Sequence, residues 1–404
     1  MNLFVVNSGS SSIKYQLFKM PVESPICSGL VERIGLENSI ITHKIFTGGE
    51  EKVVRETKTL ANHEEGLHEV ARLLTDAEIG VIKDPSEIDA VGHRVVHGGE
   101  AFKATTFITG DVKDKIQALF KLAPLHNPAN YLGIQVAEKI FTQAKQVAVF
   151  DTAFHQQMPP VAYRYAIPKK YCTDERIRAY GFHGTSHKYV SEQAAQYLGK
   201  EDAKIITIHL GNGSSMTAVD GGRSVDTTMG FGPLSGLVMG TRSGDIDGSV
   251  IFHMIDQLGY SPAQVSNLLN KQSGMLGLTG YSDMRDILKA IEAGDEEAAL
   301  AYDMYAYRIK KYIGAYAAVL NGLDAIVFTA GIGENDVTMR ELVCRNMQYL
   351  GIKLDSEKNK VRNGNLREIN ESGAPVKILV VPTNEELEIV KQCYALLQSE
   401  NVSV

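Results

Sequence analysis

The sequence of 404 residues lacks several features that mark whole classes of protein. It has no apolar stretch of the roughly 18 residues needed to span a bilayer, and its N-terminus carries only a short apolar run, residues 3–6, before a polar turn. That is not the pattern of a signal or transit peptide. Its four cysteines lie far apart without a CxxC pair, as expected of reduced thiols that serve packing rather than of a disulfide framework. Lys and Arg number 41 against 48 Asp and Glu, a net charge of −7 at pH 7, with no long run of one sign. We therefore expect a soluble, cytoplasmic protein that binds neither nucleic acid nor membrane.

The common nucleotide-binding and zinc fingerprints are missing too. No GxxxxGK[ST] segment is present, and the glycine pairs at residues 211–213 and 331–333 lack the third glycine of GxGxxG, so neither a P-loop nor a Rossmann site is indicated. His93 and His97 are four residues apart on a predicted strand, with no HExxH motif. Packing is the simpler interpretation of these two histidines.

What is present indicates a large α/β protein. The chain is 44% apolar and 22% charged, close to the average for globular proteins, and its length favours two domains. The first half begins with a meander of predicted antiparallel strands and then alternates helices with strands, which predicts a domain with a mixed sheet. The predicted strands are residues 3–6, 13–18, 26–34, 40–46, 90–96 and 147–150, and the predicted helices are 67–74, 112–122 and 129–141.

The second half repeats this order. Strands are predicted over 205–210, 216–219, 325–328 and 378–381, and helices over 295–320, 337–349 and 385–397, with a hairpin turn at 220–222 and a glycine-rich turn at 329–335. Both halves contain a strand, a small polar turn with Gly-Ser-Ser and a second strand, and the glycines of the two turns, Gly9 and Gly213, are 204 residues apart. We interpret this as an internal duplication. Two such turns would present backbone N–H groups to a phosphate chain in a cleft between the domains.

Several segments contain residue types suited to binding or catalysis. The turn 7–12, followed by Lys14, combines a glycine, hydroxyls and a cation, which suit phosphate oxygens or hydrated Mg²⁺; it also reads as an ordinary hairpin turn. Arg94, with Val96 on the same strand face, suits a small carboxylate. Asp151 directly follows an apolar strand, and because strand ends open onto the cleft of an α/β sheet, we expect it to be functional.

Other polar residues are ambiguous when taken alone. His126, His183 and Arg242 stand in apolar or glycine-rich surroundings, where each could be structural. The glycine-rich segment 329–335 suits the base and ribose of a nucleotide, since glycine permits close backbone contact, but it also fits a plain strand-to-helix turn. Glu385 opens the last helix, a position that the helix dipole favours for any carboxylate.

Nine segments, taken together and in order, resemble the acetate kinase (acetokinase) family over nearly the whole chain. They are NSGSSSIKYQLF, GHRVVHGGEAF, PLHNPAN, FDTAFH, YGFHGTSH, HLGNGSS, MGTRSGDIDG, TAGIGEN and PTNEEL. The resemblance implies a duplicated ribonuclease H-like fold of the sugar kinase, Hsp70 and actin type, with a mixed five-stranded sheet in each domain and an interdomain ATP cleft. It also implies a domain of residues 1–150 plus 385–404, a second domain of residues 151–384 with the adenosine site and the dimer interface, and a homodimer.

The same resemblance implies roles for individual residues. The implied catalytic residues are Arg94, Asp151, His183 and Arg242, the last two stabilising the transition state, and the implied pair linked to Mg²⁺ or Mn²⁺ is Asn7 and Glu385. The implied acyl pocket is Val96, Leu125, Phe182 and Pro233, with Arg94. The implied nucleotide contacts are Ser10, Ser12, Lys14, His209, Leu210, Gly211, Asn212, Gly213, Asp283, Met284, Arg285, Gly331, Ile332, Gly333, Glu334 and Asn335.

The activity implied is reversible transfer of the ATP γ-phosphoryl group to acetate, which gives ADP and acetyl phosphate and serves acetyl-CoA biosynthesis. Acetate, with a pKa of about 4 to 5, is already ionised at neutral pH and needs no general base. We therefore expect Asp151 to orient an arginine or a metal-bound water rather than to take a proton. Two alternatives remain open at this point. A propionate or other short-chain acyl kinase would share these motifs, although Val96 favours the smaller acid; an actin- or Hsp70-like nucleotide switch would leave the two arginines without an anionic acceptor.

Overall fold

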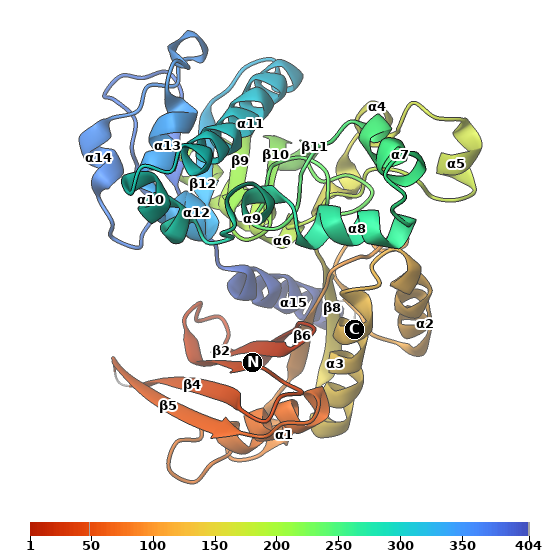
Figure 1. The fold of residues 1–404 in the computed structure, drawn as a ribbon. Helices are drawn as coiled ribbons and strands as arrows, with labels where there is room; N and C mark the ends of the chain where they lie inside the picture. Colours follow the sequence, from red (N-terminus) through yellow and green to blue (C-terminus); the bar gives the residue numbers. More distant parts are fainter. Residues whose placement is uncertain (48, 403–404) are drawn as a thin grey trace. The chain divides into compact units, whose positions relative to one another are not determined.

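The computed structural model describes residues 1–47 and 49–402, and the chain divides into two compact units (Figure 1). Unit 1 comprises Met1–Phe154 and Asn384–Val404, and unit 2 comprises His155–Thr383. The sequence placed the two divisions after residues 150 and 384; here they fall after 154 and 383. No helix among the described residues is long and apolar enough to cross a membrane.

Unit 1 contains a sheet of eight strands in the order β5-β4-β3-β2-β1-β6-β8-β7. The first four strands form the predicted antiparallel meander, which β5 extends by one strand, whereas β6 and β8 run parallel to β1 and to each other. The sheet is therefore mixed, as expected. Its strands are β1 (Asn2–Ser8), β2 (Ser12–Lys19), β3 (Pro25–Glu32), β4 (Ser39–Thr47), β5 (Glu50–Lys58), β6 (Ala90–Val95), β7 (Thr106–Phe107) and β8 (Lys145–Phe150).

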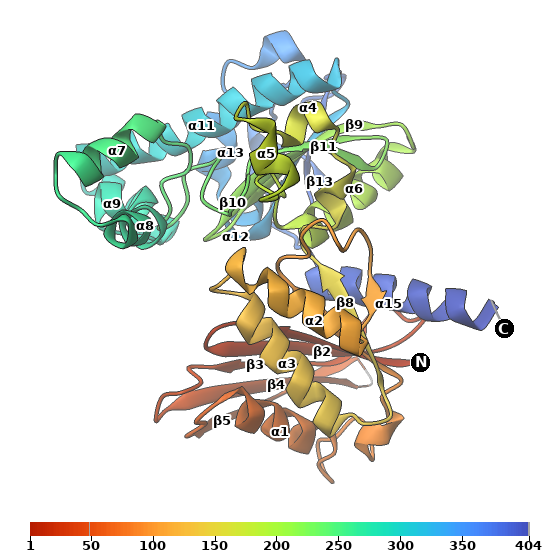
Figure 2. The same cartoon turned by 90° about the vertical axis from the view of Figure 1, so that its right-hand side faces the viewer.

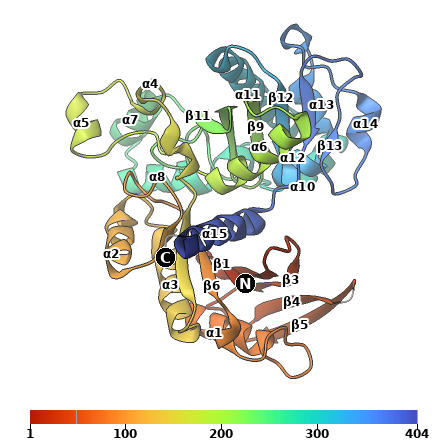
Figure 3. The ribbon, with the colours of Figure 1, turned by 180° about the vertical axis from the view of Figure 1, so that it is seen from behind.

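Helices cover both faces of this sheet. Helices α1 (His63–Leu74) and α3 (Asn127–Ile140) pack on one face, where Phe4 and Val6 join the apolar core (Figure 2). Helix α15 (Glu385–Val402) packs on the other face (Figure 3). A Cβ atom on Gly92 would lie 2.8 Å from the Cys393 sulfur, so this glycine allows α15 to approach the sheet closely. The predicted helix 112–122 ends earlier, as α2 (Gly110–Ala118) followed by a 3₁₀ turn, η2 (Leu119–Lys121).

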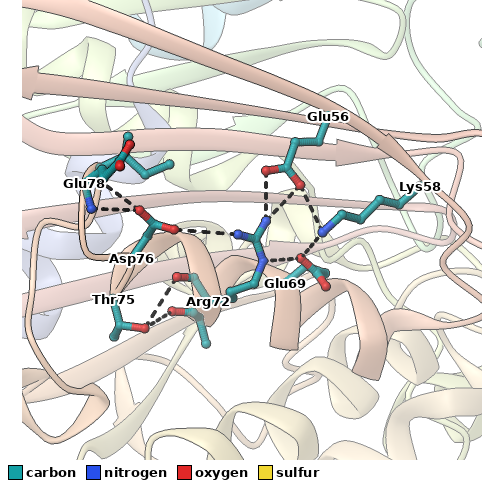
Figure 4. A network of polar contacts seen from close by, with 9 residues as sticks. Glu56, Lys58, Glu69, Arg72, Thr75, Asp76 and Glu78 are labelled. Atoms are coloured by element: carbon teal, nitrogen blue, oxygen red, sulfur yellow. Dashed lines mark hydrogen bonds and ion pairs between the residues drawn. The ribbon is translucent and has the colours of Figure 1, made fainter.

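Strand β5 was not predicted from the sequence, because it is polar and lacks a buried alternation. Ion pairs attach it to α1 instead (Figure 4): Arg72 lies 2.8 Å from Glu56, and Lys58 lies 2.7 Å from Glu69. Charged side chains of this kind are common on edge strands, where they oppose pairing with another chain. The strand thus follows from its neighbours rather than from its own hydropathy.

Unit 2 repeats the central topology of unit 1. Its six strands have the order β11-β10-β9-β12-β14-β13, and the antiparallel and parallel pairings of β11-β10-β9-β12-β14 match those of β3-β2-β1-β6-β8. An internal duplication predicts this repetition. The expectation of five strands per sheet was wrong, because β4, β5 and β7 extend the first sheet and β13 extends the second. The strands are β9 (Lys204–Leu210), β10 (Ser214–Asp220), β11 (Arg223–Thr227), β12 (Ala325–Thr329), β13 (Arg367–Glu368) and β14 (Lys377–Val380).

The long helix α11 (Glu296–Leu320) packs against one face of this sheet, and α6 (Gly184–Leu198) packs against the other (Figures 1 and 3). Two predictions need correction. Residues 330–335 form a short helix, α12 (Ala330–Asn335), rather than a turn. The next helix, α13 (Val337–Cys344), ends five residues before the predicted 349, because Arg345 is extended and Asn346 is left-handed (φ 59°). The remaining helices are α4 (Pro160–Tyr163), α5 (Lys169–Thr173), α7 (Gly248–Asp256), α8 (Pro262–Lys271), α9 (Gly274–Thr279), α10 (Met284–Glu292) and α14 (Ser356–Lys360), with 3₁₀ turns η1 (Pro85–Glu87), η3 (Phe154–Gln157) and η4 (Gln348–Leu350).

Candidate active site

In unit 1 the ends of two parallel strands bring an arginine and an aspartate together. Arg94 lies on β6, and Asp151 follows the neighbouring strand β8. The guanidinium donates from Nε to Asp151 Oδ1 over 3.1 Å and from Nη2 to Asp151 Oδ2, so the pair is bidentate. Arg94 Nη1 lies 3.4 Å from Asn7 Oδ1, and Arg94 Nε lies 3.8 Å from a Glu385 carboxylate oxygen. Asn7, Arg94, Asp151 and Glu385, predicted from separate segments, therefore form one cluster.

The cluster has an excess of negative charge. Asp151 is 1% exposed, and Glu386, also buried, pairs with Lys14 over 2.7 Å. Burial raises the pKa of Glu385 to about 7; Arg94 opposes that rise, and Asp151 and Glu386 add to it. Burial alone would lower the pKa of Arg94, but Asp151 and Glu385 raise it above its usual range. The carboxylates outnumber the cations, and such a site attracts a further cation.

Two residues that the sequence did not point to hold the first glycine-serine turn. His63 Nε2 lies 2.6 Å from the carbonyl oxygen of Gly9. Asn130 donates to the carbonyl oxygen of Ser8 over 2.8 Å, and its own Oδ1 accepts from the N–H of Val96 over 3.1 Å. The turn and the end of β6 are thus tied together. The only sequence signal was Asn130 in PLHNPAN, and nothing local distinguishes it from a helix-start residue.

In unit 2 a buried chain of hydrogen bonds leads to His183. The Ser215 hydroxyl lies 2.9 Å from His183 Nδ1 and 2.7 Å from His187 Nε2, and His187 Nδ1 lies 2.7 Å from the Thr207 hydroxyl. Burial, together with nearby His155 and His209, lowers the pKa of His187 well below its usual value, so this ring stays neutral. The chain fixes the plane of the His183 ring, which also stacks on His209 at 4.4 Å between centroids.

His183 and Arg242 lie at the second glycine-serine turn. A Cβ atom on Gly213 would lie 3.5 Å from His183 Nε2 and 3.6 Å from Arg242 Nη1, so the three predicted residues come together. His183 is left-handed (φ 55°) at the start of α6, a conformation that costs energy and is common at functional sites. Arg242 Nη1 donates to the carbonyl oxygen of Pro233 over 3.1 Å, and burial lowers the pKa of Arg242.

A cavity of about 650 Å³ in unit 2 contains most of the expected adenosine contacts. Its volume is in the range of small-molecule sites. Two of these expected contacts do not line it: Gly333 accepts from Arg340 through its carbonyl, and Glu334 accepts the N–H of Thr383. Of the expected second phosphate turn, Gly211 and Asn212 line the cavity, whereas His209, Leu210 and Gly213 do not. The cavity is lined by Gly211, Asn212, Ser282, Asp283, Met284, Arg285, Leu288, Gly331, Ile332, Asn335, Asp336, Val337, Thr338 and Arg362.

Arg340 supports this cavity by holding α12, and the sequence had not indicated any role for it. It is fully buried on α13 and donates from Nη1 to Gly333 of α12 over 2.8 Å and from Nε to Asn359 over 2.7 Å. Burial lowers its pKa to about 10. The signal available was the position of this charged residue on the apolar face of a predicted helix, in line with Cys344 and Met347.

The remaining expected residues are distributed between the units. Val96 is buried and Leu125 is 61% exposed in unit 1, whereas Phe182 is buried and Pro233 lies beside Arg242 in unit 2. Their assembly into one acyl pocket stays a prediction. Ser10 is exposed and Ser12 half-buried in the first turn. The described residues contain no group of three or more His, Cys, Asp or Glu side chains that could hold a metal, and His93 and His97 are buried packing residues.

Known proteins resemble the chain over its full length. The Acetokinase family model matches residues 2–391. The acetate kinase of Flavobacterium johnsoniae is 61% identical over 99% of this chain and 100% of its own length, and that of Methanosarcina thermophila is 50% identical over 99% and 98%. Among solved structures, Porphyromonas gingivalis acetate kinase has a TM-score of 0.91 at 45% identity, covering 98% of this chain and 99% of its own. A propionate kinase from Francisella tularensis has a TM-score of 0.89 at 42% identity, covering 97% and 98%. The chain therefore belongs to the acetokinase family.

Proposed function

We propose that this protein is an acetate kinase, which transfers the γ-phosphoryl group of ATP to acetate and forms acetyl phosphate and ADP reversibly. The observation that carries the proposal is the 61% identity, over the full length of both chains, to an acetate kinase. The arrangement of charged groups supports the same chemistry. Unit 1 presents a half-buried arginine oriented by an aspartate, and unit 2 presents a histidine and an arginine at a glycine turn beside a nucleotide-sized cavity.

In the proposed reaction a carboxylate oxygen of acetate attacks the γ-phosphorus in line. The bond between that phosphorus and the bridging oxygen breaks, and its electron pair leaves with ADP. Arg94 binds the acetate carboxylate, and Asp151 holds the guanidinium in the required orientation. His183 and Arg242 stabilise the negative charge of the transferring phosphoryl group. No residue has to remove a proton, because the acceptor is already an anion.

We propose that Asn7 and Glu385 hold Mg²⁺, directly or through water, with Mn²⁺ as a substitute. The fit rests on the cluster itself: its donors are hard oxygens, and its carboxylates outnumber Arg94 and Lys14. A divalent cation would therefore offset the excess negative charge of these carboxylates. Bound Mg²⁺ would neutralise phosphate charge. The first turn, with Ser10, Ser12 and Lys14, and the second turn, His209 to Gly213, are proposed as phosphate contacts, and the cavity in unit 2 as the adenosine site.

We further propose a cytoplasmic homodimer. The four cysteines are all free thiols, which suits a reducing compartment. Unit 2 exposes apolar side chains along α11, including Leu300 and Tyr307, which a second copy could cover. Light scattering of the purified protein tests the assembly, with a dimeric mass expected and a monomeric mass contradicting it.

Trapping of acyl phosphate as hydroxamate tests the activity. The full chain is incubated with ATP, Mg²⁺, hydroxylamine and acetate, propionate or butyrate, and kcat/KM is compared among the three acids. We expect acetate to lead by tenfold or more, since one methylene is worth about 1–3 kcal/mol in such a pocket. Equal or better use of propionate would assign the propionate reaction, as in the Francisella relative; no product with any acid would refute the kinase assignment.

A further inference from the structure

Three tyrosine hydroxyls of helix α11 contact three different parts of the candidate site in unit 2. The Tyr302 hydroxyl donates to the Asp336 carboxylate (2.7 and 2.8 Å), the Tyr305 hydroxyl lies 2.8 Å from the Ser214 hydroxyl, and the Tyr312 hydroxyl donates to Asp245 over 2.5 Å. The spacing 302, 305 and 312 places the three side chains on one face of the helix. None of these tyrosines lines the nucleotide cavity.

The Tyr312 contact supports the loop that carries Arg242. Asp245 Oδ1 accepts the N–H of Gly236 over 2.7 Å, which closes the loop 236–245. Arg308, one helical turn before Tyr312, donates to the carbonyl oxygen of Gly236 over 3.1 Å. Two side chains of α11 therefore fix both ends of this loop, and Arg242 lies inside it.

The Tyr305 contact supports the second glycine-serine turn. Ser214 begins β10 directly after Gly213, and its hydroxyl donates to the carbonyl oxygen of Gly211 over 3.3 Å. A hydroxyl has one proton, so Ser214 accepts from Tyr305 while it donates to the turn. The hydroxyl of Tyr305 thereby orients the side chain that closes the turn 211–213.

The Tyr302 contact supports the adenosine cavity. Asp336 lies between α12 and α13, caps α13 by accepting the N–H of Met339 over 2.9 Å, and lines the cavity itself. Tyr302 occupies both oxygens of this carboxylate. It therefore fixes the segment through which α12 and its glycines are placed.

A fourth tyrosine on the same face provides a natural comparison. Tyr316 is 3% exposed, yet its hydroxyl has no hydrogen-bond partner among the described residues. Burial raises the pKa of all four tyrosines, and Asp336 and Asp245 add to the rise at Tyr302 and Tyr312. The hydroxyls are therefore protonated at working pH, and the four residues differ in what each hydroxyl contacts.

We propose that Tyr302, Tyr305 and Tyr312 are positioning residues of the kinase, each fixing one part of the nucleotide and phosphoryl site through its hydroxyl group. The inference rests on the proposed function. It assigns α11 the task of holding the adenosine cavity, the phosphate turn and the Arg242 loop at fixed positions. Since errors of about 1 Å in positioning can cost around 100-fold in rate, single hydroxyls on this helix should affect either turnover or nucleotide binding, depending on the part that each one holds, without touching substrate.

The test replaces each tyrosine by phenylalanine in the full chain, which removes one oxygen and keeps the ring. Steady-state hydroxamate formation gives kcat and the KM values, calorimetry gives the Kd of ADP with Mg²⁺, and thermal unfolding gives the melting temperature. Tyr312→Phe should lower kcat about tenfold with an unchanged ADP Kd. Tyr302→Phe should weaken ADP binding about fivefold with kcat within twofold of wild type. Tyr305→Phe should change both, and Tyr316→Phe neither.

Three results would overturn the proposal. The first is wild-type kinetics and ADP binding in all three variants. The second is an effect of Tyr316→Phe as large as the effects of the three variants. The third is a loss of activity or ADP binding that only follows the fall in melting temperature, which would make the role of the hydroxyls structural. Failure of the proposed function can be told apart from failure of this inference. A wild-type chain that forms no hydroxamate refutes the kinase assignment, while ADP binding by Tyr302→Phe against Tyr316→Phe still tests the positioning of the cavity.

Discussion

The bidentate pair of Arg94 and Asp151 supports a specific prediction about Asp151→Asn. The aspartate is 1% exposed and accepts two hydrogen bonds from the guanidinium. An asparagine keeps the size of the side chain but offers one acceptor oxygen and one NH2 group, and an N–H of that group would face a guanidinium N–H. One charge-assisted hydrogen bond is lost and Arg94 turns away from its orientation, with Glu385 as the remaining carboxylate at 3.8 Å.

The size of the effect follows from the bond that is lost. Hydrogen bonds to charged groups contribute about 1.5–3 kcal/mol, and each 1.36 kcal/mol is a factor of ten in rate. We therefore expect kcat/KM for acetate to fall about 10- to 150-fold. The loss should be the same at pH 6, 7 and 8, because the carboxylate positions the arginine and takes no proton.

The assay is hydroxamate formation at the three pH values. The matched control is Asp324→Asn, which removes a carboxylate that also accepts two hydrogen bonds from one cation, Lys200, at 2.9 Å, outside the candidate site. The control should keep wild-type kinetics. A loss below threefold for Asp151→Asn would refute the positioning role, and residual activity that rises tenfold per pH unit would instead show that Asp151 acts as a base.

Three further predictions follow from the structure. Val96→Ala should raise the propionate-to-acetate ratio of kcat/KM about tenfold, since one methylene is worth about 1–3 kcal/mol. Arg340→Gln should raise the KM of ATP and lower the melting temperature, because buried acceptors on α12 and α14 lose their donor at about 1–3 kcal/mol each. Burial lowers the pKa values of His43, His93 and His97 to about 4. Because these folded-state pKa values lie below the unfolded-state value of about 6.5, each histidine makes its full contribution to stability above pH 6.5, and that contribution is lost as the pH falls toward 4. Urea unfolding should therefore show a free energy of unfolding that is about 2 kcal/mol per histidine lower at pH 5 than at pH 8.

Each of these predictions has a contradicting result. An unchanged acid preference in Val96→Ala would remove that residue from the acyl pocket. A wild-type KM for ATP in Arg340→Gln, with lowered stability, would restrict Arg340 to a structural role. If replacement of His43 by Gln does not flatten the pH dependence of the unfolding free energy, the acid sensitivity has another origin; Lys44→Gln, the exposed neighbour, is the control.

The sequence by itself determined the order of the elements and part of the site. The alternation of apolar and polar residues along the strands, and the position of Asp151 at a strand end, depend only on residues close in the sequence. Once β6 and β8 pair as parallel neighbours, their carboxyl ends meet and bring Asp151 beside Arg94. The family resemblance supplied the roles that local patterns left open. Lone residues such as His183 and Arg242 had no local signal that separated function from packing.

Only the tertiary structure decided the remaining contacts. Polar strand β5 forms because α1 and β4 offer partners. The glycine-rich segment is held as α12 because Arg340, on the later helix α13, donates to the carbonyl oxygen of Gly333. The tyrosine contacts of α11 join residues 34 to 91 positions apart. Backbone preferences and hydrophobic periodicity act over a few residues, whereas these hydrogen bonds exist only once packing has excluded water and left each buried polar group with few partners to choose from.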